Sequence, residues 1–314
     1  MTTTVQPLPV LGELPREPRP MAPPRYEQPV LRIVVLFLLT CLSTFWAGSG
    51  GTFSTIDRLP GIAPNASGVV LIGIWHDGLV YMLCVMGILL AHEMGHFVQA
   101  VRYGVPASLP FFIPMPISPI GTMGAVISMR GSGADRKELF DIGLTGPLAG
   151  LLVAIPLLWI GIQQAPAFPM NVQVPTTHFE DPLLMKWMMW YLRPDLAPGQ
   201  ELSLTPLLRA GWFGLLLTGL NMLPISQLDG GHVSYALFGR GSVWLARAVF
   251  AAAFAFIYFA EAYGWMVMLL LVMLIGIQHP PTANDRAPMS WGRRALGLAS
   301  LAIPILCMTP NPIR

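Results

Sequence analysis

Long apolar runs separated by short polar segments set the pattern of this chain. A transmembrane helix needs about 20 apolar residues, and most of these runs approach that length. The pattern predicts an all-α membrane protein with about six transmembrane helices, or seven if the last and shorter run also crosses. The runs cover residues 31–47, 79–101, 142–162, 207–223, 243–260, 265–277 and, last, 295–307.

Residues 106–130 break this helical pattern between the second and third predicted spans. The stretch is strongly apolar, but its recurring prolines exclude a spanning helix. Residues 124–130 have strand character after a Gly-Thr-Met-Gly turn. Two interpretations stay open. The segment is a re-entrant loop or β-hairpin beside a site, offering an edge strand to an unwound substrate, or it is a proline-rich cap over the helices.

The polar segments predict the organisation around these spans. Residues 1–30 contain eight prolines and several arginines, so we expect a disordered cytoplasmic tail rather than a cleavable signal. We expect a membrane core at 31–280, then a cytoplasmic loop and last short apolar segment at 281–314. Residues 48–65 would form an outer loop, and 183–192, which hold two tryptophans, an interfacial helix. The pattern leaves open whether 69–75 belong to the second span.

Composition supports the membrane assignment. The chain of 314 residues is 54% hydrophobic and 11% charged, against about 25% charged residues in soluble domains. A net charge of +2 without basic clusters gives no reason to expect nucleic-acid binding. Cys41, Cys84 and Cys307 lie in separate apolar runs, so we expect neither a disulfide framework nor a cysteine–zinc cluster.

The second predicted span carries the sequence H-E-x-x-H. His92 and His96 are four residues apart and share one face of a helix, where two imidazoles can bind one Zn²⁺ ion. Glu93 lies beside them without having to ligate, which suits a general base acting on water. The alternative is a chance match, but an unpaired buried carboxylate is costly inside a membrane.

Asp229 follows the fourth predicted span, in the same half of the membrane as the two histidines. Catalytic zinc sites commonly have three protein ligands and an open position, so Asp229 is a candidate third ligand. Gly230 and Gly231 would let the backbone bend away after it. The alternative is an aspartate that ends a helix at a cytoplasmic turn. The sequence Gly-Pro-Leu-Ala-Gly at 146–150 allows close helix approach, a kink at its proline, or both.

The remaining histidines receive weaker assignments. His232 would close the open position if it ligated, so we expect it near the site without binding metal. His76, His178 and His279 lack ligand-type spacing, and we expect them to be solvated.

A second motif, N-x-x-P-x-x-x-L-D-G, runs from Asn221 to Gly230. With H-E-x-x-H, it makes the chain resemble the site-2 protease family of intramembrane zinc metalloproteases, over about residues 31–280 and in the bacterial and chloroplast-like branch. The resemblance implies that His92, His96 and Asp229 bind one zinc ion, that Glu93 is the catalytic base and that Asn221 assists near the oxyanion. No loop has room for the PDZ domain of some relatives.

The expected function is hydrolysis of peptide bonds within or near transmembrane segments. Substrates would be single-span membrane proteins in the lipid bilayer, and the active site would face the cytoplasm of a bacterial inner membrane. One alternative is a non-proteolytic metal-binding scaffold that retains such partners. Another is a transporter with a midplane metal, but the sequence lacks the inverted repeats that transporters favour. The oligomeric state is not indicated.

Overall fold

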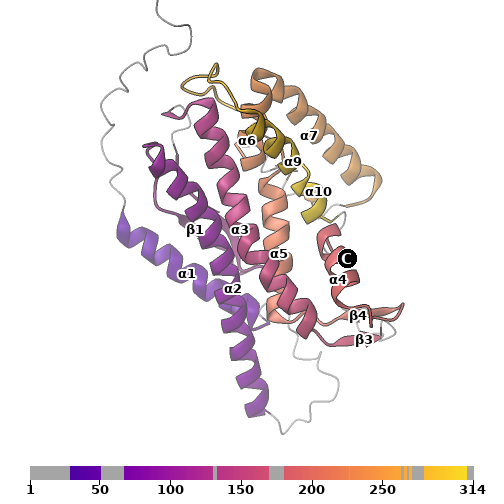
Figure 1. The fold of residues 1–314 in the computed structure, drawn as a ribbon. Coiled ribbons are helices and arrows are strands. Elements are labelled where there is room, and N and C mark those ends of the chain that lie inside the picture. Colours follow the sequence, from indigo (N-terminus) through magenta and orange to yellow (C-terminus); the bar gives the residue numbers. More distant parts are fainter. Residues whose placement is uncertain are drawn as a thin grey trace, which may run out of the picture.

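The computed structural model describes residues 29–50, 67–129, 133–169, 180–225, 227–262, 265–266, 269–270 and 279–309. These residues form a mostly helical protein (Figure 1). The predicted tail up to residue 28, the predicted outer loop from residue 51 to 66, most of the predicted span at 265–277, and His178 lie outside the described residues.

Four helical stretches in the described part of the chain are long and apolar enough to cross a membrane: Val30–Gly48, Ile74–Arg102, Arg136–Gln164 and Asp229–Phe259. A helical membrane protein is therefore confirmed, whereas the count of six spans is not. The predicted span at 207–223 forms a helix of 16 residues, Pro206–Asn221, which ends shortly before Pro224.

The centre of the bundle consists of α2 (Ser67–Arg102), α3 (Arg136–Gln164) and α5 (Pro206–Asn221), with α1 (Val30–Gly48) against α2. Their main hydrophobic cluster includes the fully buried Tyr81, Leu158 and Leu215. Helix α2 begins at Ser67, so residues 69–78 continue the second span without interruption. Gly78 lets the end of α1 pack closely against this helix, because a Cβ there would lie 2.2 Å from the Ser49 hydroxyl oxygen.

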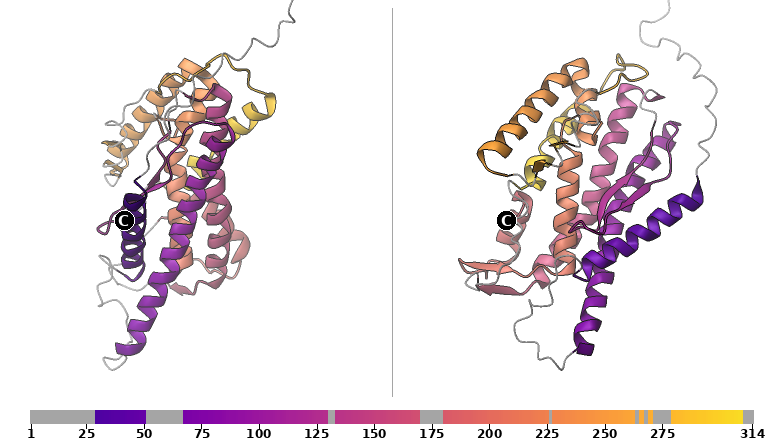
Figure 2. Two further views of the ribbon diagram at one scale, coloured as in Figure 1. Left: turned by 90° about the vertical axis from the view of Figure 1, so that its left-hand side faces the viewer. Right: turned by 180° about the vertical axis from the view of Figure 1, so that it is seen from behind.

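The proline-rich stretch contains a β-hairpin, one of the two forms the sequence allowed. Strand β1 (Phe111–Pro114) pairs antiparallel with β2 (Thr122–Val126), with Phe111 opposite Val126 and Pro114 opposite Thr122. Figure 2 shows the hairpin alongside α1. Ser43 of α1 joins the two, because its hydroxyl donates to the Gly121 carbonyl and accepts from the Met115 amide at 3.2 Å.

The far end of the bundle holds the predicted interfacial helix, α4 (Leu183–Leu192), and a small antiparallel pair, β3 (Ala167–Pro169) with β4 (Gln200–Leu202). Arg193, just after α4, donates to the carbonyls of Ile162 and Ala165 at the end of α3. These carbonyls lack helical partners, so the guanidinium caps α3 and fixes α4 against it.

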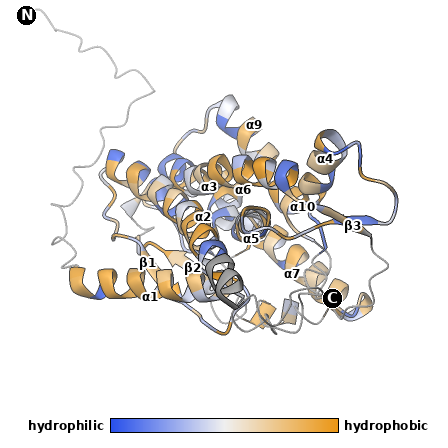
Figure 3. Cartoon of the chain, turned by 90° about the horizontal axis from the view of Figure 1, so that it is seen from below, coloured by the Kyte–Doolittle hydropathy of each residue, from blue (hydrophilic) through white to orange (hydrophobic). Residues whose placement is uncertain are grey.

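The other end holds α6 (Asp229–Phe238), the 3₁₀ turn η4 (Gly239–Gly241) and α7 (Ser242–Phe259). The predicted last run at 295–307 is split between α9 (Trp291–Ser300) and α10 (Ile303–Cys307), because a turn precedes Pro304. Helix α9 lies against α6 and α3, and α10 against α5 and α4. Hydrophobic residues cover the outer surfaces of α1 and α7 (Figure 3). Leu31 and Phe259, for example, are 77% and 82% exposed, as expected of lipid-facing side chains.

Candidate metal centre

The two histidines of H-E-x-x-H meet the aspartate of the second motif. His92 and His96 lie on α2, and Asp229 is the first residue of α6. Asp229 carboxylate oxygens lie 3.1 Å from His92 Nε2 and 3.3 Å from His96 Nε2, and the two Nε2 atoms are 3.1 Å apart. The structure therefore brings together the three ligands that the sequence indicated, although 137 residues separate His92 from Asp229.

The orientation of these side chains fits a zinc site. His96 Nδ1–H donates to the Ile142 carbonyl at 2.8 Å, which leaves Nε2 as the lone-pair nitrogen that faces the other two ligands. Two imidazole nitrogens and a carboxylate oxygen are a common protein ligand set for catalytic zinc, with a fourth position open. The three ligand atoms lie within 4.8 Å of one another, close enough for one ion.

Glycines create the space that this site needs between α2 and α3. A Cβ on Gly146 would lie 2.1 Å from His96 Nε2, and one on Gly150 would lie 3.2 Å from His92 Nδ1. On the other helix, a Cβ on Gly95 would lie 2.5 Å from the Thr145 carbonyl oxygen. The close approach expected from the glycines at 146 and 150 is therefore present, while α3 continues through Pro147.

Glu93 is buried next to the three ligands, with 5% of its surface exposed. Strand β2 of the hairpin packs against α2, the helix that carries Glu93. The hairpin therefore lies against the helix of the candidate base.

Asn221 ends α5, and its side-chain nitrogen lies 3.3 Å from His92 Nε2, at the edge of the ligand group. The chain then turns and returns as α6. Gly230 was expected to bend the backbone away after Asp229, but it instead forms part of the first turn of α6. Its role is close packing, because a Cβ there would lie 2.0 Å from the Met222 carbonyl oxygen.

His232 lies outside the group formed by His92, His96 and Asp229. Its Nδ1 is 2.6 Å from Nε2 of His279, whose ring stacks on Tyr235 with centroids 4.5 Å apart. His279 is partly exposed and also contacts His232 and Tyr235, and these contacts were not expected because a separation of 47 residues carries no spacing signal. His76, in contrast, has a side chain that is 73% exposed.

Comparison with known proteins agrees with this geometry. The family model of Peptidase family M50 matches residues 80–262, which contain both motifs. Two similar curated proteins are the probable chloroplastic zinc metalloproteases EGY1 of Oryza sativa subsp. japonica and of Arabidopsis thaliana. The rice protein is 33% identical over 74% of this chain and 42% of its own length. The Arabidopsis protein is 34% identical over 67% of this chain and 40% of its own length.

The chain thus spans about two fifths of the length of these relatives. No solved structure matches it significantly. The match to the family model extends over more than half of the chain and includes the two histidines, the glutamate and the aspartate of the candidate metal centre. The chain belongs to peptidase family M50, which confirms the resemblance to the site-2 proteases.

Proposed function

We propose that the protein is an intramembrane zinc metalloprotease that hydrolyses peptide bonds within or near the transmembrane segments of other proteins. The observation that carries this proposal is the group of His92, His96 and Asp229 with Glu93 buried beside it, on helices apolar enough to lie in a membrane. The relatives are named as probable zinc metalloproteases. The histidine–carboxylate ligand set suits that ion.

In this mechanism His92, His96 and Asp229 hold the ion, and the hydrogen bond from His96 to Ile142 fixes the orientation of one imidazole. Zinc would supply a Lewis acid that polarises the scissile carbonyl and brings the pKa of water towards about 7. Glu93 takes the proton of the attacking water and later delivers it to the leaving amine. The Asn221 side-chain amide donates to the carbonyl oxygen as negative charge develops there.

The β1–β2 hairpin is the proposed substrate guide. A helical substrate must unwind first, because its carbonyls are shielded by their own hydrogen bonds. An unwound segment can pair with the edge of a strand, and β2 packs against α2, the helix that carries Glu93. Pairing there would bring a substrate peptide bond to the base. In this arrangement the hairpin is re-entrant, and single-span membrane proteins are the expected substrates.

The proposed orientation places the metal centre towards the cytoplasm or its organellar counterpart. Support comes from the basic residues at that end of the described chain, namely Arg102, Arg136, Lys137, Arg286, Arg293 and Arg294. The relatives are named as chloroplastic proteins, so they do not support the bacterial inner membrane that we expected.

Replacing Glu93 by Gln tests the reaction. The change keeps the shape of the side chain and removes the base, so cleavage of a single-span substrate in reconstituted vesicles should fall by about 10²–10⁴-fold. Bound zinc, measured by elemental analysis, should stay near one ion per chain. Zinc loss in the His96→Ala protein serves as the control for the metal measurement.

The same variant separates the alternatives. If the protein is a metal-binding scaffold, the wild type and the Glu93→Gln variant should both retain partner proteins, and neither form should cleave them. Substrate cleavage that survives Glu93→Gln would overturn the assignment of the base. Zinc that remains bound after Asp229→Ala would overturn the assignment of the third ligand.

A further inference from the structure

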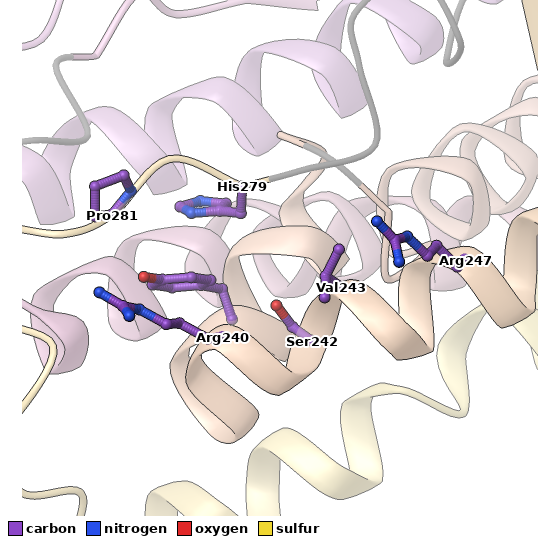
Figure 4. Close-up of a pocket in the computed structure, with 7 residues that line it drawn as sticks. Arg240, Ser242, Val243, Arg247, His279 and Pro281 are labelled. Carbon is purple, nitrogen blue, oxygen red and sulfur yellow. The ribbon is translucent and has the colours of Figure 1, made fainter.

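A basic pocket lies outside the metal centre, where α6 turns into α7. It has a volume of about 320 Å³ and is lined by Tyr235, Arg240, Ser242, Val243, Arg247, His279 and Pro281. Figure 4 shows Arg240 and Arg247 at opposite ends of this pocket, with Ser242 and Val243 between them and His279 and Pro281 along the other side.

The pocket is electropositive. Among the described residues, two arginines and no carboxylate line it. Within the described part of the chain, neither Arg240 nor Arg247 forms an ion pair, although Arg247 lies over the Trp244 ring at 4.9 Å. The nearby Asp285 carboxylate accepts hydrogen bonds from Tyr235 and Thr282, and it also attracts Arg240 without forming an ion pair with it. Both guanidinium groups can therefore contact an anion in the pocket.

The position of the pocket on α7 indicates where that anion comes from. Helix α7 has 18 residues, roughly 27 Å of helix, close to the thickness of the hydrocarbon layer. Trp244 is 69% exposed near its first end and Tyr258 is 66% exposed near its last, as in the aromatic belts at the two membrane interfaces. The pocket at the first end therefore lies at the level of the lipid headgroups.

The outer face of α7 continues from the pocket as an apolar surface. Phe254 and Tyr258, seven and eleven residues after Arg247 and so on the same face of the helix, are 57% and 66% exposed, and α7 packs mainly against α6 among the described elements. A ligand with a phosphate in the pocket and acyl chains along this face would match both the basic pocket and the apolar surface. A soluble phosphate compound would contact only the basic pocket.

We propose that this pocket binds the headgroup of an anionic phospholipid. Arg240 and Arg247 contact the phosphate, and Ser242 offers a hydroxyl. His279 forms one wall and contacts His232, whose Cβ lies against Gly143 of α3. The bound lipid would thus be connected to the metal-centre region through the contacts of His279 with His232 and of His232 with α3.

Native mass spectrometry of the full chain in detergent tests the proposal, with titration of phosphatidylglycerol and phosphatidylcholine of equal acyl length. The wild type should retain the anionic lipid about tenfold more strongly, since each arginine near a headgroup contributes a few-fold. The double variant R240Q/R247Q should lose most of this preference. The matched control R286Q/R294Q removes two exposed arginines from the same end of the protein and should keep it.

Equal retention of the two lipids by the wild type would overturn the proposal, as would an equal loss in both double variants, which indicates only net charge. Glycerol phosphate that competes as strongly as the lipid would show a soluble-phosphate site instead. Hydrogen exchange of the wild type gives an independent readout: phosphatidylglycerol should slow exchange at residues 240–247. Absence of that protection would contradict the proposal whatever the variants do, and Glu93 chemistry affects none of these measurements.

Discussion

At the residue scale, the metal centre depends on where side chains are missing. The His96 imidazole occupies the place that a Cβ on Gly146 would fill, and the His92 ring lies next to Gly150. Gly87, on α2, differs from both, because a Cβ added to Gly87 would have no other atom within 4 Å. These three glycines form a graded series in which the added methyl group approaches the ligands by different amounts.

Gly146→Ala should displace His96 and weaken zinc binding by about tenfold or more, the size of effect seen when ligand orientation is disturbed. Gly150→Ala should have a smaller effect, because its Cβ would lie 3.2 Å from His92 Nδ1. Gly87→Ala is the matched control and should leave affinity unchanged. Competition with a fluorescent chelator measures all three, and wild-type affinity in Gly146→Ala would contradict the packing argument.

Asp181 gives a prediction about pH, since it lies outside the candidate spans. Burial raises the pKa of its carboxyl to about 6, with the neighbouring carboxylates of Glu201 and Glu180 adding to the effect and Lys186 opposing it. The folded state thus favours the protonated form. The stability from this group is fully present below the unfolded pKa of about 4 and is lost as pH rises through about 6.

The wild type should therefore lose stability as the pH rises from about 4 to 7, and Asp181→Asn should not show this loss. Thermal unfolding in detergent across this range measures it, and the variant should have the flatter profile. Asp195→Asn is the control, because the hydrogen bond from Arg193 lowers the pKa of the exposed Asp195 carboxyl. A wild-type pH profile in Asp181→Asn would contradict the assignment.

At the element scale, the β1–β2 hairpin is fixed at its turn. Gly121 has φ +84°, and a Cβ there would lie 2.5 Å from the Ser43 carbonyl oxygen of α1. Gly124 has φ +104° but no atom within 4 Å of its Cβ position. Both positions favour glycine for backbone reasons, and only Gly121 also contacts α1 closely. The pair separates backbone strain from the docking of the hairpin.

Gly121→Ala should lower the melting temperature more than Gly124→Ala and should reduce cleavage more strongly. Each alanine costs about 1–2 kcal/mol for its positive φ, and the first adds a steric conflict that pushes the hairpin off α1. Thermal unfolding and vesicle cleavage assays measure the two effects. Equal effects of the two variants would mean that hairpin docking on α1 matters little.

The sequence predicted this element scale unevenly. Hydropathy located α1, α2, α3, α4 and α7 to within a few residues at most of their ends, and proline located the hairpin. It did not show that α2 begins at Ser67, because Gly78 interrupts the apolar pattern while permitting contact with Ser49. It also did not show the split of 295–307, since the arrangement of α9 and α10 depends on packing against α3, α4, α5 and α6.

At the scale of the whole molecule, the site residues illustrate the same limit. Spacing predicted His92, Glu93 and His96 as site residues, and depth in the membrane predicted Asp229; the structure brings the two histidines and the aspartate together. The contacts of β2 with α2 and of His279 with His232 join distant segments through the fold. Their residue types have no fixed spacing, so a single sequence gives no signal for them.

The two ends of the molecule should face opposite sides of the membrane. Ala283 is exposed at the metal-centre end, and Gln200 is exposed on β4 at the other end (Figure 1). In sealed vesicles of a cysteine-free variant, a membrane-impermeant maleimide should label only one of Ala283→Cys and Gln200→Cys, and permeabilisation should expose the other. Labelling of both from one side would contradict the proposed orientation.

The ligand geometry also has a consequence in terms of polymer physics. An ion shared by His92 and Asp229 acts as a reversible cross-link that closes a loop of 137 residues. For a covalent link, closing a loop of this size removes about 5 kcal/mol of unfolded-chain entropy. Chelation would release this restraint at the start of α6, and α7 depends mainly on α6 for its packing among the described elements. The metal would then take part in the reaction and would also stabilise the fold by linking α2 to α6.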